Sequence, residues 1–377
     1  MPMSSSGDPD RVASGLRRDA AERPGPAAAG PAPPPPPDPF LRRRANVLTD
    51  WEAWRAFLIR WGISGASLVG GLAALFVFRR GVPHVAWIVG YVVVLWLLVT
   101  VLTQVRERLE ARGRRGVVSA GEYTIQTLYH GLLLFVVPGY LASTTFDAVT
   151  LPFFLILAAA ALLTTVDPWY RLVVHPYPSV ARAFFAFSLF AGLNVALPLV
   201  GVAPAWALLG AAALAGLALT PVYLRREGRW QNAAARAGLS AAVAVGAAWV
   251  LLPAIPPAPL HLARPAVARA VRDLEPVDPV GSRVSAATLA EWGGLVAYTP
   301  VYAPAGLRQP IVHRWRHEGR VVTEVRLPTA VTGGRAAGFR TYSRKTDFPP
   351  QPYGRWTVDV VTASGQLIGR LRFTVGP

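Results

Sequence analysis

Seven long apolar stretches fill residues 61 to 255, and they constrain the fold more than any other feature of the sequence. Five are separate uncharged runs, 61–78, 85–103, 124–144, 148–166 and 237–255. The other two come from one uncharged run, 183–224, which Gly201 and Pro204 interrupt. A helix needs about 20 apolar residues to cross the hydrocarbon core of a bilayer. The runs are continuous rather than alternating, so we expect about seven transmembrane helices within residues 51–255 instead of barrel strands.

Composition supports a membrane protein over the competing interpretation, a large buried helical core in a water-soluble chain. Hydrophobic residues make up 53% of the sequence and charged residues only 16%. The absence of cysteine excludes disulfides and thiolate chemistry. All basic residues except Lys345 are arginine, and alanine, glycine and proline are abundant, which is typical of a GC-rich bacterial genome.

The placement of arginine predicts the orientation of the helices. Arginines concentrate in the N-terminal segment and in the second, fourth and sixth loops: Arg42, Arg43, Arg44, Arg55, Arg106, Arg108, Arg112, Arg114, Arg115, Arg171, Arg182, Arg225, Arg226, Arg229 and Arg236. The first loop holds Arg79 and Arg80, whereas the third and fifth loops hold none. Because positive residues mark the cytoplasmic side, we expect a bacterial inner-membrane protein with a cytoplasmic N-terminus and an extracytoplasmic C-terminal domain.

Two segments flank the apolar region. Residues 1–50 are rich in proline, alanine and arginine, and they cannot bury enough apolar surface to become ordered. We expect a disordered tail there, although the run Pro33 to Pro37 would also suit a polyproline ligand. Residues 256–280 are predicted to form a connector in which residues 262–274 make a short amphipathic helix.

Residues 281–377 have the pattern of an all-β domain. Strand-like segments flank Glu318-Gly319 and Ser364-Gly365, two hairpin signals. Around the second turn, Trp356, Val358 and Val360 alternate with polar residues, and Ile368 falls on the polar side with Arg370, Arg372 and Thr374. Period-2 alternation means one packed face and one wet face, so we expect an antiparallel sandwich.

The same segment resembles a small bacterial envelope domain of unknown function. Its pattern is a His-x-Trp strand, an Arg-x-x-Ser-x-Lys strand and a Gly-x-Trp-x-Val hairpin ending in Phe-x-Val. The matching residues are His313, Trp315, Gly319, Arg340, Ser343, Lys345, Gly354, Trp356, Val358, Gly365, Phe373 and Val375. Multi-span chains with this tail resemble a bacterial membrane family of unknown function. The resemblance implies no activity and supplies no catalytic or binding residue.

Few polar residues lie within the apolar runs. His130 and Asn194 are candidates for lining a small-molecule path. The simpler interpretation gives each of them one hydrogen bond between helices. Aspartate, glutamate and lysine are missing from the runs, so the sequence offers neither a carboxylate relay nor a lysine Schiff base.

The loop 167–178 holds a second, weaker cluster. Asp167, Arg171 and His175 are spaced by four residues and would share one face of a helix. This spacing resembles an acid–base site, but two good ligands are too few for a metal. We therefore expect no metal centre and no cofactor.

The strand around residue 342 is the best candidate for binding a partner. Arg340, Tyr342 and Arg344 lie on one side by period 2, opposite Thr341, Ser343 and Lys345. Two guanidinium groups beside a tyrosine suit a carboxylate or phosphate. Alternatively, one of the arginines pairs with Asp359 or Glu324 across the sheet.

From residue 256 onward, 16 basic residues face 8 acidic ones. We therefore expect an envelope protein, held in the lipid bilayer, whose external domain binds a protein, a cell-wall polymer or another anionic partner. Nucleic acid is not expected there, and an enzyme is less expected than a binding protein. The alternatives are a small-molecule transporter or channel and, less favoured, a membrane enzyme that uses the 167–178 loop.

Overall fold

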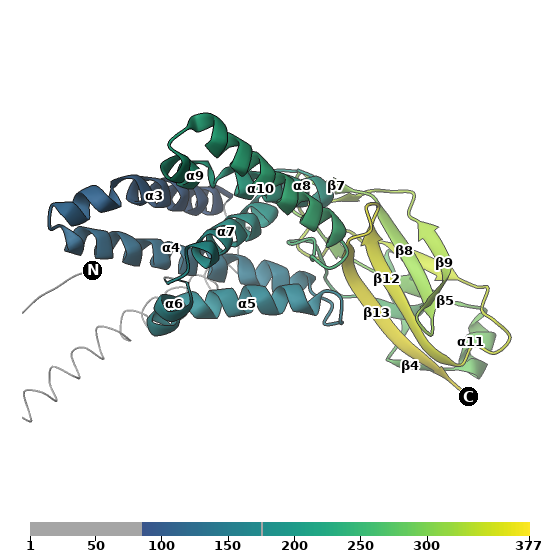
Figure 1. Ribbon diagram of the computed structural model, residues 1–377. Coiled ribbons are helices and arrows are strands. Elements are labelled where there is room, and N and C mark those ends of the chain that lie inside the picture. The colour runs from purple at the N-terminus through teal and green to yellow at the C-terminus, as the bar shows by residue number, and fades with distance from the viewer. Residues whose placement is uncertain (1–84, 175) are drawn as a thin grey trace, which may run out of the picture. The chain divides into compact units, whose positions relative to one another are not determined.

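The computed structural model describes residues 85–377 except residue 175, with helices first and strands second (Figure 1). The predictions for residues 1–84, including the tail and the run 61–78, lie outside the described residues. The helices are α3 Val85–Ala111, α4 Arg115–Ser143, α5 Leu151–Thr165, α6 Asp167–Val173, α7 Pro178–Leu199, α8 Pro204–Leu217, α9 Thr220–Glu227, α10 Trp230–Val250 and α11 Ala286–Trp292.

Strands occupy most of the chain after residue 260. They are β1 His261–Leu262, β2 Ala266–Arg272, β3 Glu275–Val280, β4 Arg283–Ser285, β5 Leu295–Tyr298, β6 Val301–Tyr302, β7 Arg308–Gln309, β8 Ile311–His317, β9 Arg320–Arg326, β10 Val331–Thr332, β11 Tyr342–Lys345, β12 Gly354–Thr362 and β13 Leu367–Gly376.

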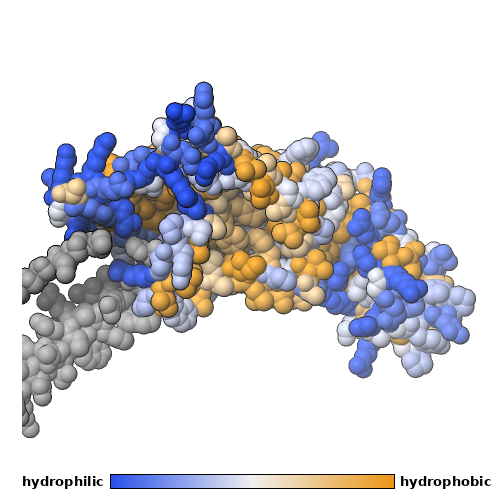
Figure 2. Space-filling view, viewed as in Figure 1, coloured by the Kyte–Doolittle hydropathy of each residue, from blue (hydrophilic) through white to orange (hydrophobic). Residues whose placement is uncertain are grey.

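Five helices in the described part of the chain are long and apolar enough to cross a membrane: Ile88–Ala111, Arg115–Ser143, Pro178–Leu199, Pro204–Glu227 and Trp230–Val250. On the face shown in Figure 2, hydrophobic residues cover the middle of the helices, whereas hydrophilic residues gather over α9, over the end where α3 meets α4, and over the strands. Exposed tryptophans lie at both ends of α10, Trp230 and Trp249. A helix rises 1.5 Å per residue, so these rings are about 28 Å apart along the axis. That spacing matches the hydrocarbon thickness and the interfacial preference of tryptophan.

The predicted span 148–166 is shorter than expected. It becomes α5, which has 15 residues and a length of about 22 Å. Before it, the side chain of Asp147 accepts hydrogen bonds from the backbone N–H groups of Val149 and Thr150 and holds a loop. After it, Val166 is extended and Pro168 lies in the first turn of α6. Proline favours a break before it, so the apolar run is divided between helix, loop and a second helix.

The long run 183–224 divides where the sequence predicts. Helix α7 ends at Leu199, Gly201 has a φ of 89°, and Pro204 begins α8. Glycine tolerates the left-handed backbone, and proline is accommodated in the first turn because its missing N–H would have no helical partner. These two residues therefore make a tight reversal between two antiparallel helices.

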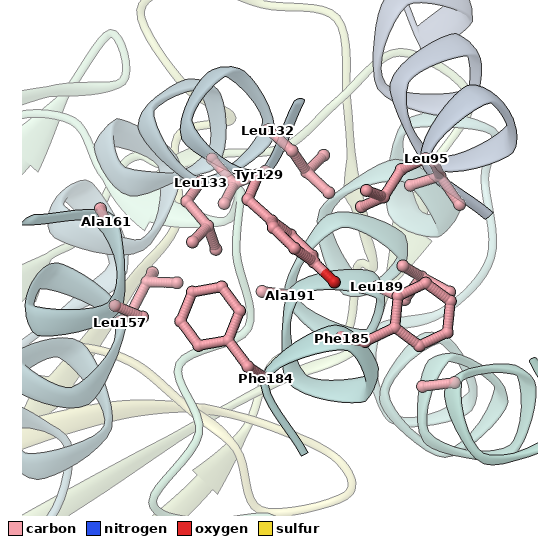
Figure 3. Packing of buried hydrophobic residues seen from close by; sticks show 14 of the residues in the cluster. Leu95, Tyr129, Leu132, Leu133, Leu157, Ala161, Phe184, Phe185, Leu189 and Ala191 are labelled. Carbon is pink, nitrogen blue, oxygen red and sulfur yellow. The ribbon is translucent and has the colours of Figure 1, made fainter. Parts of the chain in front are cut away.

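The helices share a buried core, and α4 and α7 lie at its centre. Helix α4 packs against α3, α5 and α7, and α8 packs against α7 and α10. Leu95, Leu133, Leu157 and Leu189 come from four different helices and belong to the same buried cluster as Tyr129 (Figure 3). Tyr129 also meets Phe184 edge to face, with ring centroids 5.0 Å apart. Such packing holds the helices together along their apolar length, and the ion pair of Arg106 with Glu122 joins α3 to α4 near their shared turn.

The strands form two larger sheets and two short pairs. The four-stranded sheet has the order β11-β5-β2-β3, and the five-stranded sheet has the order β4-β13-β12-β8-β9. The short pairs are β1-β6 and β10-β7. Apart from β4 and β13, which are parallel, the paired strands are antiparallel. The prediction of a C-terminal strand-rich region in antiparallel sheets is confirmed.

Both predicted hairpins are present. Strands β8 and β9 join through Glu318 and Gly319, whose φ angles are 45° and 82°. Strands β12 and β13 join through the turn that holds Gly365, with a φ of 96°. In the first turn, φ is positive at both central residues, and this geometry matches the twist of strands joined by a two-residue hairpin turn.

The two larger sheets share one hydrophobic core. Trp315 from β8 and Trp356 from β12 are completely buried and pack with Phe373 from β13. The four-stranded sheet contributes Val267, Leu295 and Ala297 to the same cluster. The alternation predicted for β12 therefore points its tryptophan and valines inward.

The amphipathic helix predicted over residues 262–274 is wrong, because this segment forms β1 and β2. Asp273 and Leu274 have φ angles of 51° and 61°, and they close a hairpin between β2 and β3. Strand β2 also pairs with β5. The segment Ala266–Arg272 alternates as well as it repeats helically, and the sheet on either side decides between the two patterns. The β region therefore begins before residue 281.

Ile368 also departs from the prediction, which placed it on the wet side of β13. It is buried in the core shared by the sheets. The register of β12 with β13 shifts between Val360 and Val361. A β-bulge of this kind puts an extra residue into one strand and re-aims the side chains beyond it.

We expect a fragment of residues 259–377 to melt cooperatively, and a fragment of residues 281–377 to lose that transition. The shorter fragment removes β2 and β3, and with them the buried side chains of Leu260 and Val267. Each large apolar side chain lost from a core costs about 2–5 kcal/mol. Circular dichroism melting of both fragments measures the difference. Equal melting temperatures would contradict the assignment of β2 and β3 to this core.

Candidate partner-binding site

Strand β11 divides its side chains between two environments. Tyr342 is 47% exposed and Arg344 is also exposed, whereas Thr341, Ser343 and Lys345 are buried. The strand lies at one edge of the four-stranded sheet, paired with β5. The side assignment made from period 2 is therefore what the structure shows.

The exposed side of β11 borders buried residues of the neighbouring strand β5. Tyr342 lies directly opposite Tyr298, and Arg344 lies opposite Val296. The guanidinium of Arg340 donates to Glu275 at 2.7 Å, and that of Arg344 donates to the carbonyl oxygen of Trp292 at 3.5 Å. Both contacts are exposed, and exposed ion pairs contribute little stability. The surface therefore places two guanidinium groups and a tyrosine within reach of a ligand.

The predicted alternative, pairing of these arginines with Asp359 or Glu324, is wrong. Glu324 accepts from Arg314 at 2.9 Å, and Asp359 accepts from Arg316 at 2.8 Å. Both acids lie on the five-stranded sheet, whereas β11 belongs to the other sheet.

The inward side of β11 joins the two sheets through a buried polar network. The Nδ1 atom of His313 lies 2.8 Å from the hydroxyl of Ser343, and its Nε2 atom lies 2.9 Å from the hydroxyl of Thr299. The indole N–H of Trp315 donates to Ser343 at 3.0 Å. Burial lowers the pKa of His313 to about 4, so the ring is neutral near pH 7. The network therefore satisfies buried polar groups rather than holding a charge.

Lys345 is the last inward-facing residue of β11. Its ammonium donates to the hydroxyl of Thr323 on β9 at 2.8 Å and lies 5.5 Å from the ring centroid of Phe348. Burial lowers the pKa of this amine, and Asp347 partly opposes that shift. His313, Trp315, Ser343 and Lys345 all belong to the envelope-domain pattern, and they meet in one place.

The two polar candidates of the membrane region each bond between helices. The Nδ1 atom of His130 on α4 lies 3.1 Å from the hydroxyl of Thr165 on α5. The amide of Asn194 on α7 donates to the hydroxyl of Tyr140 on α4 at 2.8 Å. These contacts agree with the simpler of the two interpretations, and they leave the lining of a path as an untested expectation.

The 167–178 cluster is only partly described. Asp167 and Arg171 belong to α6, and His175 lies outside the described residues. Arg171 lines a cavity of about 190 Å³ with Glu122, Tyr123, Gln126 and Tyr170. In the described part of the chain, no group of three His, Asp or Glu side chains is placed to hold a metal ion.

Sequence reasoning missed a charged contact between β13 and the loop after α4. Arg370 donates to Asp147 at 2.9 Å and to the buried Asp359 at 3.0 Å, and Arg372 donates to the carbonyl oxygen of Thr145 at 3.0 Å. Burial alone would raise the pKa of Asp147, but hydrogen bonds from Thr150 and Thr145 and the charge of Arg370 lower it. The Arg-x-Arg spacing in both β8 and β13 could have indicated this contact. Residues two apart share one face of a strand, so Arg314, Arg316, Arg370 and Arg372 lie on the same face of the five-stranded sheet.

These features define a multi-helix membrane protein with a C-terminal strand-rich region. The family described as "Family of unknown function (DUF5924)" matches residues 44–296, and the chain belongs to this family. A second family, described as "Protein of unknown function (DUF2914)", matches residues 308–375. No curated protein and no solved structure matches the chain. The expected membership of a family of unknown function is confirmed.

The stability of the β region should fall as the pH drops from about 6.5 to about 4. The folded pKa of His313 is about 4 and lies below its ordinary value of 6.5, so the unfolded chain binds more protons in this window. That difference is worth about 3 kcal/mol, present above pH 6.5 and lost toward pH 4. Denaturant unfolding across this range should show the slope, and His313→Gln should flatten it. An identical slope in the variant would assign the effect to other groups.

Proposed function

We propose that this chain is a bacterial inner-membrane protein whose extracytoplasmic β domain binds an anionic partner through Arg340, Tyr342 and Arg344. The observation that carries the proposal is the exposed side of β11. The edge strand exposes Tyr342 and Arg344, Arg340 is exposed two residues before the strand begins, and the other side of the strand is anchored in the core. Planar guanidinium groups bind carboxylate or phosphate through paired hydrogen bonds.

We further propose that the two larger sheets form a sandwich. Their shared core, with both tryptophans buried between them, supports this arrangement. The bridge from His313 to Ser343 links a strand of one sheet to a strand of the other. A rigid platform beneath β11 would hold its outward side chains in place and reduce the ordering cost of binding.

The orientation rests on where the arginines lie relative to the strands. Helix α4 runs from the arginine-rich turn that holds Arg112 and Arg114 to the loop that holds Asp147. Asp147 contacts Arg370 of β13. The β region and the arginine-rich turn are therefore at opposite ends of α4, as expected if arginine marks the cytoplasmic side and about seven helices cross the membrane.

We expect the double variant Arg340→Ala with Arg344→Ala to weaken binding of an acidic polymer by at least about tenfold. Hydrogen bonds to charged groups contribute about 1.5–3 kcal/mol each, and 1.4 kcal/mol corresponds to tenfold in affinity. The measurement is fluorescence anisotropy of labelled poly-glutamate and polyphosphate with the full chain in detergent. Binding to the unaltered chain should weaken as salt rises.

The matched control removes the same charge from the other sheet. Arg326→Ala with Arg355→Ala alters two exposed arginines of β9 and β12. An equal loss of affinity in both double variants would mean that net charge, rather than the surface around β11, binds the polymer. A lowered melting temperature of the Arg340 and Arg344 variant, with affinity retained per folded molecule, would also reject the site.

A reporter enzyme that is active only in the cytoplasm should be inactive when fused after residue 377. The same reporter fused after residue 113, in the arginine-rich turn between α3 and α4, should be active. The reason is the unequal distribution of arginine between the two sides. Activity after residue 377 would overturn the proposed orientation.

A further inference from the structure

An apolar groove of about 380 Å³ lies among four helices of the membrane region. Helix α7 lies between α10 and α5 in Figure 1, and residues of α5, α7, α8 and α10 line the groove. Phe153, Phe187 and Phe190 supply aromatic walls. The volume is within the range of small-molecule sites, about 300–1,000 Å³.

Small residues along α8 and α10 make room for the groove. Gly216 of α8 lies so close to α10 that an added Cβ would come within 2.5 Å of the Cα of Ala241. Ala244, Ala247 and Ala248 continue along α10 and leave space beside its backbone. Close approach of two helices through small residues is common in membranes. Here the small side chains of α8 and α10 leave room for the groove beside the place where the two helices touch.

Polar chemistry is confined to one end of the groove. Ser240 lines it, and its hydroxyl lies 2.9 Å from that of Tyr223 on α9. One helical turn before Ser240 on α10 is Arg236, which pairs with Glu227 at 3.1 Å and keeps 53% of its side chain exposed. Residues four apart share a helix face, so Arg236 extends the groove-lining face of α10.

A second arginine marks the same end. Arg182 lies one turn before Ala186 on α7, and Ala186 lines the groove. Helices α7 and α10 begin at Pro178 and Trp230, so Arg182 lies in the second turn of α7 and Arg229 directly precedes α10. The groove therefore has an apolar length, and two arginines and Glu227 lie on the helices beyond its polar end, which leaves a net positive charge that complements an anionic amphiphile.

We propose that this groove binds an anionic phospholipid, with an acyl chain along α10 and the phosphate beside Arg182 and Arg236. Arginine binds phosphate through a planar fork of donors, and basic pockets between transmembrane helices recognise anionic head groups. The site is independent of the partner surface on β11. It distinguishes an anionic lipid from a zwitterionic one by charge, and from bulk lipid by the fit of an acyl chain in the groove.

Native mass spectrometry of the detergent-purified full chain tests the proposal with phosphatidylglycerol and phosphatidylcholine. We expect one phosphatidylglycerol to be retained with at least fivefold preference. Ala244→Phe with Ala247→Phe should abolish retention by filling the groove. Val243→Phe with Leu239→Phe places the same two aromatic side chains at exposed positions of α10 outside the groove lining and should retain the lipid. Equal retention in both double variants would overturn the site.

The head-group contact is tested separately. Arg182→Gln with Arg236→Gln should bring the preference for phosphatidylglycerol to about one, whereas Arg112→Gln with Arg114→Gln, in the turn before α4, should leave it unchanged. Loss of preference in both variants would show a general charge effect and overturn the assignment to these two arginines.

A smaller change covers the case in which the phenylalanine variants do not fold. The chain contains no cysteine, so Ala247→Cys and Val243→Cys each create one labelling site. We expect phosphatidylglycerol to slow maleimide labelling at position 247 several-fold and to leave position 243 unaffected. Protection at position 247 that does not depend on added lipid would mean that another segment of the chain fills the groove, and would overturn the proposal.

Discussion

The hydrocarbon core of a bilayer cannot hydrogen-bond to a peptide group, and this constraint organises the helical part of the chain. The long apolar runs in the described part of the chain therefore form helices over most of their length, and a helix satisfies its backbone internally. Polar side chains in the region bond either to their own helix, as Ser188 does, or to another helix, as Asn194 does with Tyr140. With so little polar chemistry available, helix association depends on fit, and alanine and glycine positions decide where helices can approach.

The sequence predicts that the first part of the chain is helical, because the length of its uncharged runs specifies helices. It predicts the ends of the individual helices less well. Gly201 and Pro204 mark the break between α7 and α8 correctly, since both act through local backbone preferences. The run 148–166 fails as a full span because its first residues are held in a loop around Asp147, and that loop contacts Arg370, 223 residues away. Local pattern carries no information about such a contact.

In the candidate site, too, the sequence predicts local features but not the contacts between distant residues. Period 2 correctly separates Tyr342 and Arg344 from Ser343 and Lys345, because alternation is a property of any strand. It cannot say that Ser343 meets His313 or that Arg340 meets Glu275, since those partners come from other strands. The segment before residue 281 misleads for a related reason. Its alanine, valine and arginine residues fit a helix or a strand, and the pairing with β5 selects the strand.

The match to the second family begins at residue 308. Residues on both sides of this boundary belong to the one hydrophobic core of the β region. Strands β2, β3 and β5 precede that boundary, whereas β11 follows it, and all four build one sheet. A recombination event that moved residues 308–375 to a different membrane domain would transfer β11 without the strand on which it pairs. The recipient would have to supply three strands of its own before the transferred β11 could take its place in a four-stranded sheet.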